Sequence, residues 1–212
     1  MRLGIALLLL LVGCQPEQPA PPPASDFVSV FNGVDLTGWT GDLDGYAVEN
    51  GSIVSLKDGG GNIYIDQPYS DFVLQFEFKL EPGGNNGLGI RAERGKDAAY
   101  YGMEIQILDD TAEEYAELHD YQYHGSIHGV RAAERGHQHP LGEWNQEEVT
   151  ARGTHITVKL NGATIVDYDL EASRAGTADG KEHPGLFNPT GYIGFLGHGH
   201  RVEFRNIRIK TW

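Results

Sequence analysis

A run of alternating apolar and polar side chains over residues 72–80 constrains the fold more than any other segment. Phe72, Leu74, Phe76, Phe78 and Leu80 share one parity, and the residues between them are mostly polar. A period of two gives a β-strand one apolar face and one polar face. Long helical patterns are missing from the sequence, so the chain is expected to be an all-β protein.

Further strand patterns are separated by turn signals. The pairs Asn50-Gly51 and Asn161-Gly162 lie between short apolar runs, which is typical of type I′ hairpins. We expect strands over residues 46–48, 53–54, 87–93, 156–160, 165–168, 192–196 and 202–209, and helical turns near 112–118 and 170–175. Many short strands with closely spaced turns predict a two-sheet antiparallel β-sandwich of jelly-roll type, formed as a single domain by residues 26–212.

The N-terminus has the form of a bacterial lipoprotein signal. An apolar run over residues 3–12 is too short to cross a bilayer as a mature helix and fits a secretory signal. It ends in Leu-Val-Gly-Cys, a lipobox whose Cys14 would carry the lipid. We therefore expect removal of residues 1–13, a Pro-rich tether over 14–25, and attachment to the bacterial cell envelope, facing the periplasm or in the outer membrane.

Charge and missing motifs exclude several classes of function. The formal net charge of −14 argues against nucleic-acid binding and against electrostatic adhesion to acidic lipids, which leaves the anchor as the membrane contact. Cys14 is the single cysteine, so a disulfide within the chain is excluded. The sequence contains no phosphate-binding loop, dinucleotide fingerprint or Gly-x-Ser-x-Gly elbow, and nucleotide-dependent and serine-hydrolase activities have no support.

The strand pattern over residues 100–109 combines an apolar face with a polar face that can carry chemistry. Glu104 and Gln106 lie on the polar face, and Asp109 closes the run. Carbohydrate-active β-sandwich enzymes place their acids and bases on a rigid strand in this way. A solvated outer face is the alternative interpretation of the same pattern.

Several short motifs, in order along the chain, resemble the bacterial 3-keto-disaccharide hydrolase domain family. They are found at residues 31–39 (FNGVDLTGW), 71–72, 85–91, 103–109, 142–145, 160–162, 197–199 and 202–209. Each motif is weak alone, but together they are specific and cover nearly all of residues 27–212. The resemblance implies a concanavalin-A-like sandwich of the lectin and glucanase type. It also implies action on glycosides whose C3 hydroxyl has been oxidised to a ketone.

That substrate class suggests roles for the polar strand residues. A C3 ketone acidifies the proton on C2, and its removal gives an enolate that expels the C1 substituent; water can add later. The reaction needs a base near C2, a donor or cation near the C3 oxygen, and an acid for the departing oxygen. Glu104 is the preferred carboxylate, with Gln106 as an orienting amide, Asp109 as a second carboxylate and Arg91 as the cation. For Arg91, a salt bridge to Glu104 or Glu93 is the alternative interpretation.

Histidines supply the remaining candidates. All nine follow residue 118, and His124 is the preferred C2 base, because the resemblance implies tyrosine more often at the position of His128. The expected substrate contacts are Asn86, His128, Trp144 and His198. A divalent metal held by Glu104, Asp109 and backbone carbonyls is kept open, without an assigned ligand set.

Three functional interpretations follow. The first is an envelope-anchored enzyme that cleaves 3-keto-glycosides, downstream of a separate sugar 3-oxidoreductase. The second is a lectin-like module that binds glycans without turning them over; the two share a fold, so the fold cannot decide between them. The third is an ordinary glycosidase with Glu104 and Asp109 as its carboxylate pair.

Overall fold

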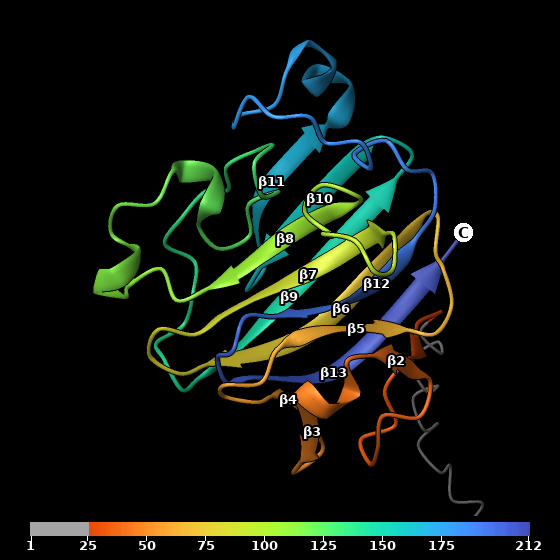
Figure 1. The fold of residues 1–212 in the computed structure, drawn as a ribbon, viewed down its shortest axis with the longest axis vertical. Helices are drawn as coiled ribbons and strands as arrows, with labels where there is room; N and C mark the ends of the chain where they lie inside the picture. The colour runs from red at the N-terminus through yellow and green to blue at the C-terminus, as the bar shows by residue number, and fades with distance from the viewer. Residues whose placement is uncertain (1–25) are drawn as a thin grey trace, which may run out of the picture.

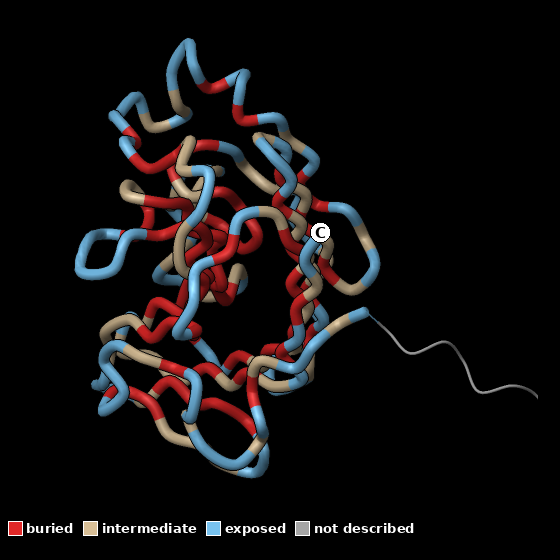
Figure 2. The backbone as a smooth tube through the Cα atoms, turned by 90° about the vertical axis from the view of Figure 1, so that its right-hand side faces the viewer, coloured by how far each residue is buried: buried red, intermediate tan, exposed pale blue. Residues whose placement is uncertain are grey.

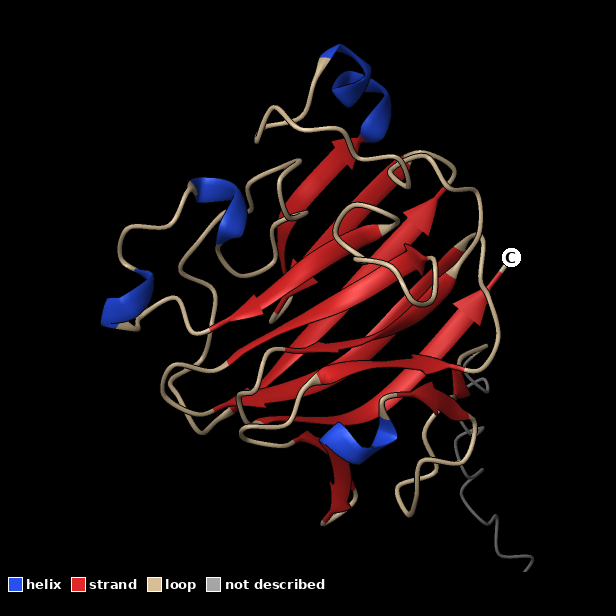
Figure 3. Cartoon of the chain, viewed as in Figure 1, coloured by secondary structure: helices blue, strands red, loops and turns tan. Residues whose placement is uncertain are grey.

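The computed structural model describes residues 26–212, which form a sandwich of two antiparallel sheets (Figure 1). The predicted signal segment, Cys14 and the tether lie outside the described residues. Helical structure within residues 26–212 consists of short 3₁₀ turns between strands (Figure 3). None of these turns is long and apolar enough to span a membrane.

The larger sheet has the strand order β11-β10-β9-β6-β13-β4-β3, with β1 paired to β13. Its strands are β1 (Val28–Ser29), β3 (Tyr46–Glu49), β4 (Ser52–Ser55), β6 (Phe72–Leu80), β9 (Trp144–Arg152), β10 (His155–Leu160), β11 (Ala163–Asp169) and β13 (Val202–Thr211). Long β6 lies near the middle, between β9 and β13.

The smaller sheet has the order β2-β5-β12-β7-β8, so that β8 forms one edge. Its strands are β2 (Trp39–Gly41), β5 (Gly61–Ile65), β7 (Asn85–Ala92), β8 (Met103–Leu108) and β12 (Tyr192–Gly197). The 3₁₀ turns are η1 (Leu43–Gly45), η2 (Glu113–Tyr115), η3 (Asp120–Gln122) and η4 (Leu170–Ala175). Turns η2 and η4 fall where the sequence predicts helical turns.

The core lies between the sheets, and buried residues are concentrated in the strands of both layers (Figure 2). All five apolar residues that alternate along β6 are buried, which confirms the predicted pattern. Phe195 of β12 stacks on Phe204 of β13, with ring centroids 3.7 Å apart and planes 12° from parallel. Because these strands belong to different sheets, the aromatic contact joins the layers directly.

Both predicted type I′ hairpins are confirmed by backbone geometry. Asn50 and Gly51 have φ values of 49° and 76° between β3 and β4, and Asn161 and Gly162 have 50° and 87° between β10 and β11. Positive φ at both central residues matches the right-handed twist of the flanking strands and is tolerated best by asparagine and glycine. These turns set the register of two hairpins in the larger sheet.

The aromatic contact between the sheets gives a first prediction. Phe204→Ala removes a fully buried ring and leaves a cavity, so we expect the free energy of unfolding to fall by about 3–5 kcal/mol. Urea denaturation measures the loss. Val34→Ala, at a position that is 75% exposed, is the control and should change stability very little. Equal effects of the two substitutions would contradict the packing.

Candidate functional site

Strand β8 is buried on both faces, although it lies at the edge of the smaller sheet. Its inner side chains join the core, while Glu104 and Gln106 on the outer face are only 6% and 5% exposed. The segment 125–128 runs along the open edge of β8 and pairs with it: the amide of Gly125 donates to the carbonyl of Gln106 (2.7 Å), and that of His128 to the carbonyl of Glu104 (2.9 Å). This segment thus pairs with the free backbone groups at the edge of β8 and brings His128 beside the polar face.

Glu104 is paired with His198, which follows the end of β12. The Nε2 atom of His198 lies 3.4 Å from Oε1 of Glu104, and the two side chains are 46% and 8% exposed. The carboxylate lies over Gly87 of β7, where a Cβ atom would be 2.0 Å from Oε1. A buried carboxylate therefore supports an imidazole that solvent or a ligand can reach.

The same pair sets the protonation of the imidazole. The hydrogen bond that His198 donates to Glu104 raises the pKa of His198 above its ordinary value, because the carboxylate stabilises the imidazolium form. Desolvation opposes this rise, and the negative charges of Glu104 and Asp97 add to it. We infer that His198 is protonated over a wider pH range than a free histidine.

Gln106 is held by a second polar network on the same strand face. Its Nε2 atom donates to Oδ1 of Asn85 (2.9 Å) and to the backbone carbonyl of Asn86 (3.1 Å). Its Oε1 atom lies 3.1 Å from Nδ1 of His128. The structure therefore brings together four of the predicted site residues as two pairs, Glu104 with His198 and Gln106 with His128.

Sequence reasoning missed Asn85 and Tyr121. Asn85 shares the outward parity of Gly87, and that parity could have identified it. The prediction instead named Asn86, which is fully buried and contacts Gln106 only through its backbone carbonyl. Tyr121 of η3 stands edge-on to His128, with ring centroids 6.5 Å apart, and His119 stacks on its ring. No strand or motif pattern signals this turn.

Arg91 is not part of this group, which corrects its predicted role as an enolate-stabilising cation. Its guanidinium donates to Asp71, to the carbonyl of Ser70 and to the carbonyl of Gly153. A bulge in β7 explains the difference: three residue steps from Gly89 to Ala92 oppose two steps on β12, and Arg91 adopts φ 48°. Arg91 does form a salt bridge, but with Asp71 and not with Glu104 or Glu93, the partners expected from the sequence.

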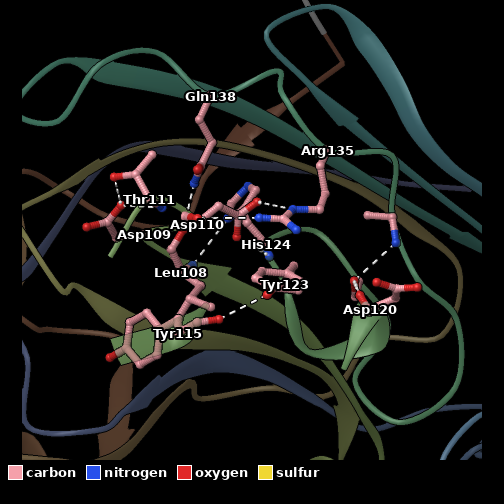
Figure 4. Close-up of polar contacts among 12 residues, drawn as sticks. Leu108, Asp109, Asp110, Thr111, Tyr115, Asp120, Tyr123, His124, Arg135 and Gln138 are labelled. Carbon is pink, nitrogen blue, oxygen red and sulfur yellow. Dashed lines mark hydrogen bonds and ion pairs between the residues drawn. The ribbon is translucent and has the colours of Figure 1, made fainter. Parts of the chain in front are cut away.

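His124 lies between the sheets rather than beside Glu104, so its predicted role as the C2 base is wrong. It is 2% exposed, packs against Phe78, and places Nε2 3.3 Å from Oε2 of the buried Glu147. Its Nδ1 atom accepts a hydrogen bond from the amide of Leu108 (Figure 4). These contacts tie the loop after β8 to the larger sheet and hold the His124 ring on the core side of the smaller sheet.

Asp109 anchors a loop, which corrects its prediction as a second site carboxylate. Oδ2 accepts from the amide of Gly83. Oδ1 accepts from the amide and hydroxyl of Thr111 (Figure 4). Both oxygens are thus engaged in shaping the chain after β8. The carboxylate pair required by the ordinary-glycosidase interpretation is not supported by this arrangement.

Trp144 lies on the opposite side of the sandwich, which excludes the predicted contact with a sugar at Glu104. It begins β9 of the larger sheet, and its ring is covered by Arg205 at 3.8 Å and by Lys79 at 4.8 Å. Both partners lie on the outer face of that sheet. Within residues 26–212, no three or more His, Cys, Asp or Glu side chains converge as metal ligands.

Comparison with known proteins connects this geometry to a family. Residues 26–210 match the model of the 3-keto-α-glucoside-1,2-lyase-like domain, and the chain belongs to that family. It is 25% identical to a 3-keto-disaccharide hydrolase of Bacteroides thetaiotaomicron, with 90% of this chain and 80% of the relative covered.

Solved structures agree with the fold. A Parabacteroides distasonis protein provisionally assigned as a glycosyl hydrolase superposes with a TM-score of 0.77 at 26% identity, covering 88% of this chain and 99% of the other. A carbohydrate-binding module from Bacillus subtilis gives a TM-score of 0.53 at 16% identity, covering 84% and 98%, and shows similarity of fold alone. The predicted lectin and glucanase type of sandwich is therefore confirmed.

The Glu104–His198 pair gives a second prediction. Glu104→Gln keeps the shape of the side chain but removes the charge, so we expect the pKa of His198 to fall toward its ordinary value of about 6.5. An NMR titration of the histidine ring protons measures this shift. Glu134→Gln, which removes the exposed partner of His137, is the matched control and should leave His198 unchanged. An unchanged His198 pKa in Glu104→Gln would contradict the pair.

Proposed function

We propose that this protein cleaves 3-keto-glycosides, including 3-keto-disaccharides, at the outer face of β8 and β7. One observation carries the proposal: a nearly buried carboxylate, Glu104, supports a half-exposed imidazole, His198, in a chain of the 3-keto-α-glucoside-1,2-lyase-like family. A buried acid paired with an accessible base or acid is the arrangement that proton-transfer chemistry requires.

The site suits elimination better than ordinary glycoside hydrolysis. Abstraction of the C2 proton beside a C3 ketone gives an enolate, and the enolate expels the oxygen at C1. Water then adds to the unsaturated sugar, so that the net reaction is hydrolysis. This route needs proton donors and acceptors, which the imidazoles of His198 and His128 supply. It does not need two carboxylates flanking the glycosidic bond.

A non-catalytic lectin-like module is the competing proposal. The similarity to a carbohydrate-binding module supports a shared fold but does not separate binding from turnover. Burying Glu104 costs solvation free energy, and a lectin could bind sugar hydroxyls with exposed amides at lower cost. The carboxylate–imidazole pair therefore favours the enzyme.

The proposed substrate must be supplied by another enzyme. A 3-keto-glycoside arises by oxidation of the C3 hydroxyl, so a sugar 3-oxidoreductase must act before this protein. We further propose that the lipobox at Cys14 holds the domain at the bacterial envelope, where such oxidised sugars would reach it.

Substrate choice and the carboxylate provide a third prediction. Purified residues 26–212 should cleave 3-keto-trehalose or a 3-keto-glucoside and leave the unoxidised sugar intact. Glu104→Gln should lower turnover by about 10-fold to 100-fold, because His198 loses the charge that supports it. Mass spectrometry of the products, with and without chelator, is the measurement.

Other results would lead to different conclusions. Binding of either sugar without cleavage would favour the lectin-like module. Equal cleavage of the oxidised and unoxidised sugars would contradict the requirement for the ketone.

The glycine below the carboxylate gives a fourth prediction. Gly87→Ala places a methyl group 2.0 Å from Oε1 of Glu104, so the carboxylate must move and cleavage of the keto sugar should fall by about 10-fold or more. Gly89→Ala, on the same face of β7, meets side-chain atoms at 3.2 Å and 3.5 Å and should have a much smaller effect. Steady-state kinetics with matched thermal melts compare the two variants. Equal activity in both would argue against Glu104 as the site carboxylate.

A further inference from the structure

The polar network around Gln106 determines which nitrogen of His128 carries a proton. Nε2 of Gln106 faces two acceptors, and one of them, the backbone carbonyl of Asn86, cannot act as a donor. The amide therefore keeps its oxygen toward His128. Because that oxygen can only accept, Nδ1 of His128 must donate, and in the neutral ring Nε2 holds the free lone pair.

The second imidazole on this face, that of His198, has a charged partner, whereas the partner of His128 is neutral. His198 points Nε2 at the carboxylate of Glu104, which favours the doubly protonated ring. In that form Nδ1 also carries a proton that can be donated. The neutral Gln106 amide gives His128 no such negative partner.

We propose that His128 is the base that takes the C2 proton and that His198 is the acid that protonates the departing C1 oxygen. This assignment rests on the proposed function and goes beyond it, because it divides the proton transfers between two residues. It also gives a catalytic role to His128, at a position where the family resemblance leads us to expect tyrosine more often.

The spacing of the two pairs is compatible with one sugar ring. Glu104 and Gln106 are two residues apart on β8, which places their Cα atoms about 7 Å apart on the same face. A single pyranose can reach both imidazoles from there. His128 can then approach the proton on C2 from one end of the site, and His198 can approach the oxygen on C1 from the other end.

The bond changes balance without a further reactant. Nε2 of His128 accepts the C2 proton, and the C–H electron pair forms the enolate with the C3 oxygen. When the carbonyl re-forms, the pair becomes the C1–C2 double bond, the C1–O bond breaks, and the leaving oxygen takes its proton from Nδ1 of His198. The products are an alcohol and an unsaturated 3-keto sugar, to which water can add.

Dependence on the leaving group tests the two roles separately. An alkyl 3-keto-glucoside needs an acid to release its alcohol, whereas a 4-nitrophenyl 3-keto-glucoside does not. His198→Ala should therefore lose about 100-fold in kcat on the alkyl substrate and less than about 10-fold on the nitrophenyl one. His128→Ala should lose about 100-fold in kcat on both substrates and regain activity with added imidazole. A purely structural role for His128 would not produce this rescue.

Controls keep the outcomes distinguishable. His155→Ala removes an exposed histidine paired with Asp167 and should leave both rates unchanged, and thermal melts confirm that each variant is folded. Without added imidazole, a near-wild-type rate of His128→Ala on the nitrophenyl substrate would overturn the assignment. So would an equal loss of rate for His198→Ala on both substrates. Failure of the wild-type protein to cleave either substrate would instead overturn the proposed function, and the assignment with it.

Discussion

The burial of a carboxylate and an amide on the outer face of β8 is the constraint on which the site depends. Glu104 and Gln106 are nearly inaccessible to solvent, and buried polar groups without partners would cost several kcal/mol. Their partners come from segments distant in sequence: His198 from the end of β12, Asn85 from β7 and His128 from the loop beyond β8. Satisfying these two side chains is therefore what assembles the site.

The rest of the sandwich makes that burial geometrically feasible. Gly87 leaves room for the Glu104 carboxylate, and the segment 125–128 closes the open edge of β8. His124 and Glu147, between the sheets, tie the loop that carries this segment to the larger sheet. The core, the edge and the polar face thus act as one unit, which holds two imidazoles on a rigid surface.

Much of the fold could be predicted from sequence because it follows from local rules. Alternation identified β6 and β8, and two Asn-Gly pairs identified the hairpins and their turn type. Strand β9 was missed because Asn145 and Glu147 point inward and remove the apolar alternation. The same alternation placed Glu104 and Gln106 correctly on one face.

The remaining site residues depended on features that a sequence pattern does not encode. One extra residue in β7 reversed the expected direction of Arg91. The path of the loop decided that His124 enters the core while His128 reaches the site. Trp144 could not be assigned to either outer face before the strand order was known, and the contact between Glu104 and His198 joins residues 94 positions apart.

C2 proton abstraction from a 3-keto sugar is the chemistry that we propose for this surface. Its most direct test is cleavage of a methyl 3-keto-glucoside by the wild-type protein in D₂O, with the sugar product analysed by mass spectrometry and NMR and compared with an enzyme-free incubation. We expect the cleaved sugar to carry deuterium at C2, introduced no more slowly than the C1–O bond is broken. Cleavage with only protium at C2 would contradict this proposal.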